Sequence, residues 1–242
     1  RVGSINIKYG NYEGANFVED AAANPVIQME TLKSRLHLRE GAVFKPMYLR
    51  REIPGSDLEA VEDLYGEKSY IRTIVDVTQR PNPDTGQIDL EYFVQEGLPV
   101  LVELIRIEGN VETKDTVIRR ELAISPGEPF DMGRVKLSQE RIEGLRLFQN
   151  VRVTQEPLAG SGPGNTVNRE HLVFSVKERD TGRAGFGGGF STDYGALANV
   201  FYSQENFDIM RWRRPHPLQG GGQKFRVRAV LGSKRDDYLL DY

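Results

Sequence analysis

Residues 100–130 read VLVELIRIEGNVETKDTVIRRELAISPGEPF, and this stretch decides the fold class. Apolar and polar side chains broadly alternate from Val100 to Ile107, which predicts a β-strand, and Gly109-Asn110 predicts a turn after it. Thr113 then stands where a helix N-cap is expected, ahead of apolar residues spaced for one helix face: Val117, Ile118 and Leu122. Gly127 predicts the end of this helix. The stretch therefore opens a small domain with a strand and a short helix.

A second helix and two strands complete this segment up to residue 179. Apolar residues at helical spacing mark the helix: Met132, Val135, Ile142 and Leu145. The runs Asn150–Gln155 and His171–Glu178 are predicted strands, joined by a turn-rich loop at residues 160–165. The predicted order is β-α-α-β-β.

Residues 1–97 repeat the same order of elements. An alternating strand with Val2, Ile5, Ile7 and Tyr9 is expected to end at the turn Gly10-Asn11. Two helices follow, the first marked by Leu32, Leu36 and Leu38 and the second by Leu58, Val61, Leu64 and Tyr65, with a glycine turn at Gly41 between them. The predicted strands Tyr70–Gln79 and Ile88–Glu96 then close the copy.

Two helices on one face of a three-stranded sheet form a two-layer α+β domain of ordinary size. The sequence therefore predicts two tandem domains, residues 1–97 and 98–179. A third segment, residues 180–242, has a different pattern.

Bulk composition excludes several classes of protein. The net charge is −3, with charges of both signs, so no concentrated basic surface for nucleic acid is expected. There is no cysteine, and the histidines His37, His171 and His216 are far apart, so neither disulfides nor a metal-ligand spacing is predicted. No nucleophile elbow or carboxylate pair stands out, and we expect neither an enzyme nor a cofactor. No apolar run approaches the roughly 18 residues of a membrane helix.

Residues 180–242 have the pattern of transmembrane β-strands. In Lys224–Leu231 the apolar residues Phe225, Val227, Ala229 and Leu231 alternate with Lys224, Arg226 and Arg228. An arginine facing lipid near mid-bilayer costs about 2–4 kcal/mol, so the apolar set is expected on lipid and the basic set in a wet lumen. Gly185–Thr192 and Ala196–Asn206 are two further predicted strands. We expect the chain to be a fragment that stops a few antiparallel strands into a truncated barrel.

Two segments of this tail have a competing interpretation. The glycines at 185, 187, 188 and 189 could cradle a phosphate, but no Walker lysine is present and more strand follows, so we favour a weak strand. Residues 211–217, RWRRPHP, are interpreted as a loop near the membrane–water boundary in preference to an RNA-binding patch.

Several motifs resemble a known family. The segments Ile105–Asn110, Thr116–Leu122, Pro126–Phe130, Arg141–Val151 and Phe174–Arg179 are similar to a POTRA (polypeptide-transport-associated) domain, and residues 1–97 resemble the preceding copy more loosely. Residues 177–195, KERDTGRAGFGGGFSTDYG, look like the junction between the last POTRA domain and the first barrel strand of BamA-type outer-membrane protein assembly factors.

This resemblance implies a function, partners and sites. The protein would lie in the outer membrane with its POTRA domains in the periplasm, and it would bind unfolded outer-membrane proteins and accessory lipoproteins, with no nucleic acid. An exposed sheet edge pairs with an extended polypeptide of any sequence, and the implied edge residues are Ile71, Thr73, Val75, Val77, Val151 and Val153. Arg119, Arg120 and Glu121 are implied to contact an accessory protein, or they are an ordinary solvated helix face. The weak seam of the barrel falls on Gly185, Phe186, Gly187, Gly188, Gly189 and Phe190.

Other interpretations are also compatible with the sequence. A TamA-like or two-partner-secretion transporter shares the same domains, and a soluble periplasmic POTRA scaffold would bind peptides without inserting. The edges of the POTRA sheets could also be covered by a neighbouring domain.

Overall fold

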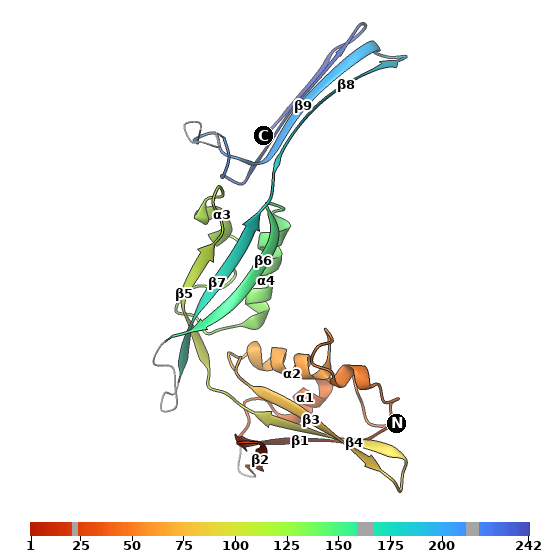
Figure 1. Ribbon diagram of the computed structural model, residues 1–242, viewed down its shortest axis with the longest axis vertical. Helices are drawn as coiled ribbons and strands as arrows, with labels where there is room; N and C mark the ends of the chain where they lie inside the picture. Colours follow the sequence, from red (N-terminus) through yellow and green to blue (C-terminus); the bar gives the residue numbers. More distant parts are fainter. Residues whose placement is uncertain (21–23, 159–166, 212–217) are drawn as a thin grey trace. The chain divides into compact units, whose positions relative to one another are not determined.

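The computed structural model describes residues 1–20, 24–158, 167–211 and 218–242 (Figure 1). The fold is α+β, as the sequence predicts. The chain forms two compact units: residues 1–104, 124–135 and 156–171 make the first, and residues 105–123, 136–155 and 172–242 make the second. Because this boundary runs through the second repeat, the domain limits at residues 97 and 179 stay predictions.

The sheet of the first repeat has four strands in the order β2-β1-β4-β3. These are β1 (Val2–Glu13), β2 (Asn16–Glu19), β3 (Ile74–Asn82) and β4 (Gln87–Gln95). Strand β4 lies in the interior, parallel to β1 and antiparallel to β3. This leaves β3 at an edge of the sheet.

Helices α1 (Met29–Arg35) and α2 (Asp57–Gly66) lie against one face of this sheet, with the 3₁₀ turn η1 (Pro46–Leu49) between them in sequence (Figure 1). The core is apolar because alternate strand positions meet the apolar stripes of the helices. Its fully buried members include Leu32, Tyr65, Val75, Leu90 and Tyr92.

Four predictions for the first repeat are wrong. The sheet has four strands instead of three, because β2 pairs with β1, and α1 ends at Arg35, so Leu36 and Leu38 follow the helix. The strand does not turn at Gly10-Asn11 but continues to Glu13, because β2 pairs closely alongside: a Cβ at Gly10 would lie 2.1 Å from the Val18 carbonyl oxygen. The expected strand from Tyr70 begins only at Ile74, since residues 70–73 form a turn in which Thr73 donates N–H and Oγ1–H to the Tyr70 carbonyl.

The second repeat has a three-stranded sheet in the order β5-β7-β6. Its elements are β5 (Val100–Glu108), α3 (Asp115–Arg119), α4 (Met132–Gly144), β6 (Phe148–Pro157) and β7 (Asn168–Glu178). The predicted turn glycines Gly109 and Gly127 have φ of +89° and +85°, which L residues with a Cβ rarely adopt. The predicted loop at residues 160–165 lies outside the described residues.

Thr113 is not the N-cap that the sequence predicts. Lys114 occupies that position without a side-chain cap hydrogen bond. The Thr113 hydroxyl instead accepts a hydrogen bond from Asn206 Nδ2 at 2.9 Å, and its N–H donates to Glu178 at 2.7 Å. A partner remote in sequence has taken the oxygen that would otherwise cap the helix.

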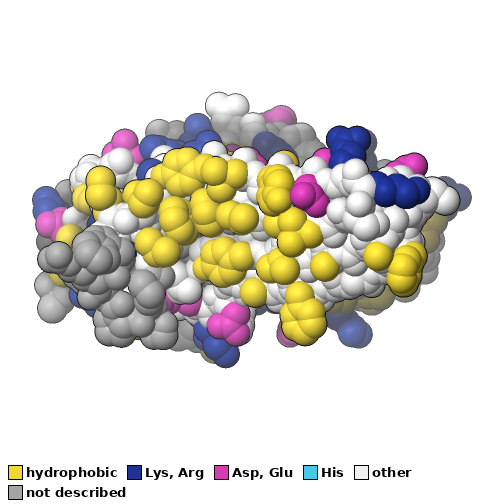
Figure 2. Space-filling model, turned by 90° about the horizontal axis from the view of Figure 1, so that it is seen from above, with side chains coloured by type: hydrophobic (Ala, Val, Ile, Leu, Met, Phe, Trp, Pro, Cys, Tyr) yellow, Lys and Arg dark blue, Asp and Glu magenta, His cyan; other side chains and the backbone are white. Residues whose placement is uncertain are grey.

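The tail forms an antiparallel sheet in the order β11-β10-β9-β8. The strands are β8 (Gly182–Ser191), β9 (Gly195–Phe207), β10 (Gln223–Gly232) and β11 (Asp237–Asp241). Their register aligns apolar residues on one face: Phe186, Phe190, Ala196, Ala198, Val200, Tyr202, Phe225, Val227, Ala229, Leu231, Tyr238 and Leu240. Arg226 and Arg228 point to the other face, as predicted. Figure 2 shows hydrophobic side chains gathered in one broad patch on the face in view.

None of the described helices is long and apolar enough to cross a membrane.

A buried carboxylate organises the first repeat. Asp57 is fully buried at the start of α2 and accepts N–H hydrogen bonds from His37 at 2.6 Å and Leu38 at 3.2 Å. The Tyr92 hydroxyl of β4 donates to it at 3.3 Å. One side chain thus joins the segment after α1, the start of α2 and the central strand.

We expect Asp57→Ala to lower the free energy of unfolding of the first repeat by about 3 kcal/mol, because several buried donors lose their acceptor. Urea unfolding followed by amide hydrogen exchange in β4 measures this change. Asp84→Ala, in the exposed hairpin turn, is the matched control and should shift stability by less than about 0.5 kcal/mol. Equal effects of the two variants would contradict the organising role of Asp57.

Candidate binding edges and seam strand

The strands predicted to bind a partner lie at the edges of their sheets. Strand β3, with Val75 and Val77, and strand β6, with Val151 and Val153, each have only one neighbour in their sheet. Val75 and Val151 are buried, whereas the exposed fraction rises along both strands after them. Ile71 and Thr73 do not belong to the edge, because they lie in the turn before β3.

The trio Arg119-Arg120-Glu121 is not a continuous helix face. Helix α3 ends at Arg119, and the next two residues form the turn after it. The Arg119 guanidinium pairs with Asp115 and also donates to the Ile105 carbonyl, and Arg120 pairs with Glu121 at 3.3 Å. Both arginine side chains remain about half exposed, so the trio is open to a partner but its charges are already locally paired.

Strand β8 contains the predicted seam residues and is an edge strand of its sheet. Phe186 and Phe190 are each 91% exposed on the apolar face. On the opposite face, the Phe201 ring of β9 occupies the space above Gly185, where a Cβ would lie 2.5 Å from the ring. Asn199 lies over Gly187 in the same way, at 2.8 Å. Two of the glycines therefore make room for β9 side chains.

Gly185→Ala should displace the Phe201 ring and loosen the pairing of β8 with β9 by about 1 kcal/mol, which is roughly a fivefold faster hydrogen exchange of β8 amides. Gly189→Ala is the matched control, since no atom lies within 4 Å of its would-be Cβ. Exchange measured by mass spectrometry in lipid nanodiscs compares the two. If both variants exchange alike, the ring does not stabilise this pairing.

A polar cluster ties the turn before α3 to the end of β9. Asn206 is buried, donates to Thr113 and accepts the Gly222 N–H at 2.8 Å. Lys114 Nζ lies 2.5 Å from Asp208 Oδ2, and the Lys114 N–H donates to the Gly220 carbonyl at 2.9 Å. All of these residues belong to the second unit. The segment before α3 and the end of β9 are therefore joined by direct hydrogen bonds, in addition to the chain that runs between them through β7.

The charge pair in this cluster sets the ionisation of Asp208. Burial alone would raise the pKa of this carboxyl, but hydrogen bonding from the Lys114 ammonium and the Met210 N–H outweighs burial, so the pKa is lowered. A carboxyl with a lowered folded-state pKa stabilises the fold above its unfolded pKa of about 3.9, and this stabilisation is lost as pH falls through the folded value.

We expect Lys114→Met to cost about 2 kcal/mol of stability at pH 7, because a buried carboxylate loses its cation. Lys114→Met combined with Asp208→Asn should recover part of this loss, and the double variant should lose less stability than the natural chain between pH 5 and pH 3. Urea unfolding at each pH gives the double-mutant cycle. Additive effects at pH 7 would show that the two groups do not interact.

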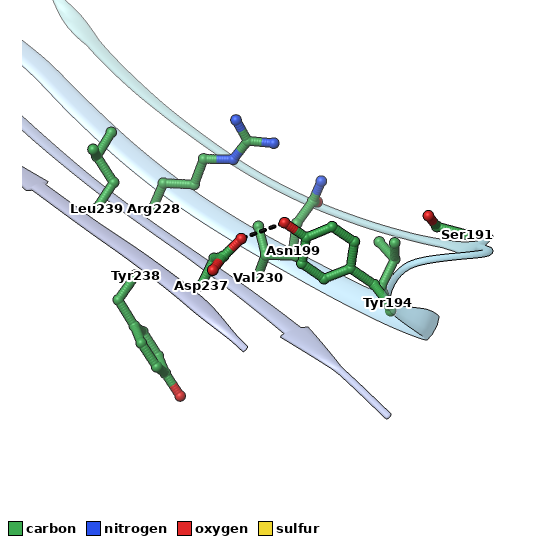
Figure 3. A pocket seen from close by; sticks show the side chains of 9 residues that line it. Ser191, Tyr194, Asn199, Arg228, Val230, Asp237, Tyr238 and Leu239 are labelled. Carbon is green, nitrogen blue, oxygen red and sulfur yellow. Dashed lines mark hydrogen bonds between the residues drawn. The ribbon is translucent and has the colours of Figure 1, made fainter. Parts of the chain in front are cut away.

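The face of the β8–β11 sheet that carries Arg226 and Arg228 has a pocket next to the turn between β8 and β9. Figure 3 shows Asn199 and Arg228 lining this pocket, with the Tyr194 hydroxyl hydrogen-bonded to Asp237. Tyr238 points away from them, toward the apolar side. Within the part of the chain that the structure describes, no group of three or more His, Asp or Glu residues could hold a metal ion. Apart from Arg211, the basic loop at residues 211–217 lies outside the described residues.

Sequence reasoning missed two residues at the binding edges. Arg51 Nη2 donates to the Val75 carbonyl at 2.6 Å, and Gln139 Nε2 donates to the Val151 carbonyl at 3.1 Å. The related sequence signal is a repeated pattern in the edge strands, VDVTQRP at residues 75–81 and VRVTQEP at residues 151–157, and it marks the two edges but not the two donors.

The second repeat matches the family model POTRA, described as surface antigen variable number repeat, over residues 100–179. Residues 100–179 are a POTRA domain. The first POTRA-like repeat, residues 1–97, shares its order of elements and its edge pattern.

Similar proteins extend this resemblance beyond the POTRA domain. The chain is 32% identical over 149 residues to outer membrane protein assembly factor BamA of Neisseria meningitidis serogroup B, which covers 62% of this chain and 18% of the relative. It is 31% identical over 181 residues to BamA of Neorickettsia risticii, covering 74% of this chain and 23% of the relative. These matches confirm the predicted resemblance to BamA-type assembly factors, and the chain spans about a fifth of the length of these relatives.

Solved structures show the same fold. BamA from Haemophilus ducreyi lacking POTRA domains 1–3 superimposes with a TM-score of 0.69 at 20% identity, covering 99% of this chain and 38% of that one. BamA POTRA3–5 from Haemophilus influenzae gives 0.55 at 21% identity, covering 73% of this chain and 61% of that one. The first of these likenesses includes the β8–β11 sheet.

Proposed function

We propose that this chain is the POTRA and early barrel part of an outer-membrane protein assembly factor. It binds unfolded outer-membrane proteins along its POTRA sheet edges and helps to insert them into the membrane. The protein belongs to the cell outer membrane, with its POTRA domains in the periplasm. The observation that carries the proposal is that one chain combines two edge strands, β3 and β6, with a sheet that has an exposed apolar face.

The edge strands suit partners of varied sequence. An edge offers backbone N–H and C=O groups, which are the same in every polypeptide, so an extended chain adds as a further strand without a specific sequence. This is the recognition that unfolded β-barrel proteins require, since they share alternation of side chains and little else.

The β8–β11 sheet suits a membrane. Its apolar face has side chains of Phe, Tyr, Val and Leu that are largely exposed, and the arginines Arg226 and Arg228 point to the opposite face. In the intact barrel, lipid covers the first face and water the second. Strand β8 is the edge of this sheet, so it is the place at which a client strand pairs and the barrel opens.

Arg119, Arg120 and Glu121 are the proposed contact for an accessory lipoprotein. Their local pairs with Asp115 and with each other hold the guanidinium groups in place at the end of α3. A partner carboxylate would exchange with these exposed pairs at small cost, because exposed ion pairs contribute about 0–1 kcal/mol.

Depleting the full-length protein should lower the amount of folded porin in the outer membrane, measured by heat-modifiable gel mobility and surface labelling. Re-expressing it with Val77→Pro and Val153→Pro together should fail to restore porins to more than about a third of normal. Proline removes an outward N–H on each edge while leaving the neighbouring ladder bonds intact.

The matched control carries Val77→Ala and Val153→Ala, which keep both N–H groups, and it should restore porins. Unchanged porins after depletion would remove the assembly role, and full restoration by the proline variant would remove the edges from it. Recovery of the full-length protein in the soluble periplasm would favour a scaffold that never inserts.

A further inference from the structure

The edge strands β3 and β6 share a seven-residue motif in which five positions are identical. Residues 75–81 read VDVTQRP in β3 and residues 151–157 read VRVTQEP in β6. Valine, valine, threonine, glutamine and proline thus recur in equivalent places, although the rest of the two repeats differs widely. A requirement shared by the two edges explains why these positions coincide.

The prolines show which backbone groups face outward. Proline has no N–H, so within a paired strand it lies where the N–H would point away from the neighbour. In β3, Pro81 lies opposite Ile88, whose N–H donates instead to Arg1 on the β1 side. Because successive residues alternate between the two sides of a strand, residues 75, 77, 79 and 81 face the free edge.

The same parity holds in β6. Leu158 donates its N–H to the Arg169 carbonyl of β7 at 3.1 Å, so even-numbered residues face β7. Residues 151, 153, 155 and 157 therefore face outward. The first valine and the proline of each motif are both outward positions.

In each motif, a side chain donates a hydrogen bond to the first carbonyl that faces the free edge. In β6 this donor is Gln139 of α4, 3.1 Å from the Val151 oxygen. In β3 it is Arg51, 2.6 Å from the Val75 oxygen and held by Glu62 of α2 at 2.8 Å.

Glu62 and Gln139 occupy matching helix positions. Each lies four residues after a buried apolar residue and three before another: Leu58 and Tyr65 in α2, Val135 and Ile142 in α4. A carboxylate cannot donate to a carbonyl, so the first repeat interposes an arginine, whereas the amide of Gln139 reaches its carbonyl directly. Two different chemistries produce the same cap.

We propose that each POTRA edge is a docking window bracketed at both ends, which admits about five residues of an extended polypeptide. The capped carbonyl closes one end, and the proline without an N–H closes the other. Between them, Val77 and Gln79, or Val153 and Gln155, each offer both an N–H and a carbonyl. This inference rests on the proposed function, in which these edges receive unfolded outer-membrane proteins. It adds that pairing is short, and therefore weak and quickly released, as a handover requires.

The window is defined by backbone groups, so the binding of a peptide of simple sequence tests it directly. The probe is a synthetic 12-residue peptide of alternating threonine and valine with one terminal fluorophore. It is added to the full-length protein in lipid nanodiscs, in a Val77→Pro background that closes the β3 edge, so that changes made at β6 report on the β6 window. Fluorescence anisotropy gives Kd, and hydrogen exchange of the peptide gives the length of the protected stretch.

With the natural β6 edge we expect protection of about five consecutive peptide residues. Gln139→Met with Pro157→Thr should lengthen the protected stretch by two or more residues and lower Kd about three- to tenfold, because each end gains a hydrogen bond. Glu140→Met, on the same helix and exposed, is the matched control and should change neither. Unchanged exchange of β7 amides verifies that the variants fold.

Three outcomes would overturn the inference, and they differ in what they say of the proposed function. An equally long protected stretch in the natural and opened edges would remove the brackets while edge binding stands. Self-association of the opened variant without longer peptide pairing would show that the brackets only protect the edge from other copies. No peptide binding by any variant would remove both the brackets and the edge-binding part of the proposed function.

Discussion

Backbone N–H and C=O groups at the edge of a β-sheet have no partner within the sheet, and each must find one in water, a side chain or another chain. This constraint applies to all three sheets that the described residues form. Strands β3, β6 and β8 are edges, and the free edge of β8 differs from those of β3 and β6. Proline and side-chain caps limit β3 and β6, whereas β8 has glycines and exposed phenylalanines. The differences follow from what each edge is expected to meet: water and extended polypeptide in the periplasm, lipid and a partner strand at the membrane.

The caps link the edges to the helices beneath them. Gln139 reaches from α4 to β6, and Glu62 reaches β3 through Arg51, so the position of each helix decides which part of its edge is open. The same helices bury the apolar face of their sheets. A change in helix packing would therefore be felt at the edge, although no residue of the edge itself had changed. At the start of α2, the Asp57 carboxylate holds the helix in place by accepting N–H hydrogen bonds from His37 and Leu38.

The glycines of β8 weaken the strand, and two of them also allow close pairing with β9. Gly185 and Gly187 accommodate Phe201 and Asn199 of β9, so these two positions favour contact across the strand pair. Gly189 has no such neighbour, and its flexibility is not offset by any contact. Side chains of β9 thus pack over β8 at Gly185 and Gly187. The outer edge of β8 presents backbone N–H and C=O groups. This asymmetry suits the role proposed for β8, in which the strand pairs with a client strand without losing β9.

The class of most elements, though not of β2 or η1, could be predicted from the sequence, because hydrophobic period and turn glycines are local signals. The two β-α-α-β-β repeats, the positive-φ glycines Gly109 and Gly127, and the two-faced strand at Lys224–Leu231 could all be predicted from residues close to one another in the chain. The partner of a polar side chain, in contrast, depends on which distant segments the fold brings together. Thr113 bonds Asn206 rather than its own helix, Gly10 continues a strand because β2 lies beside it, and Ile71 and Thr73 fall in a turn. Arg51 and Gln139 could not be assigned to the edges before the fold was known, because a cap on a carbonyl depends on the distance between segments and not on their spacing along the chain.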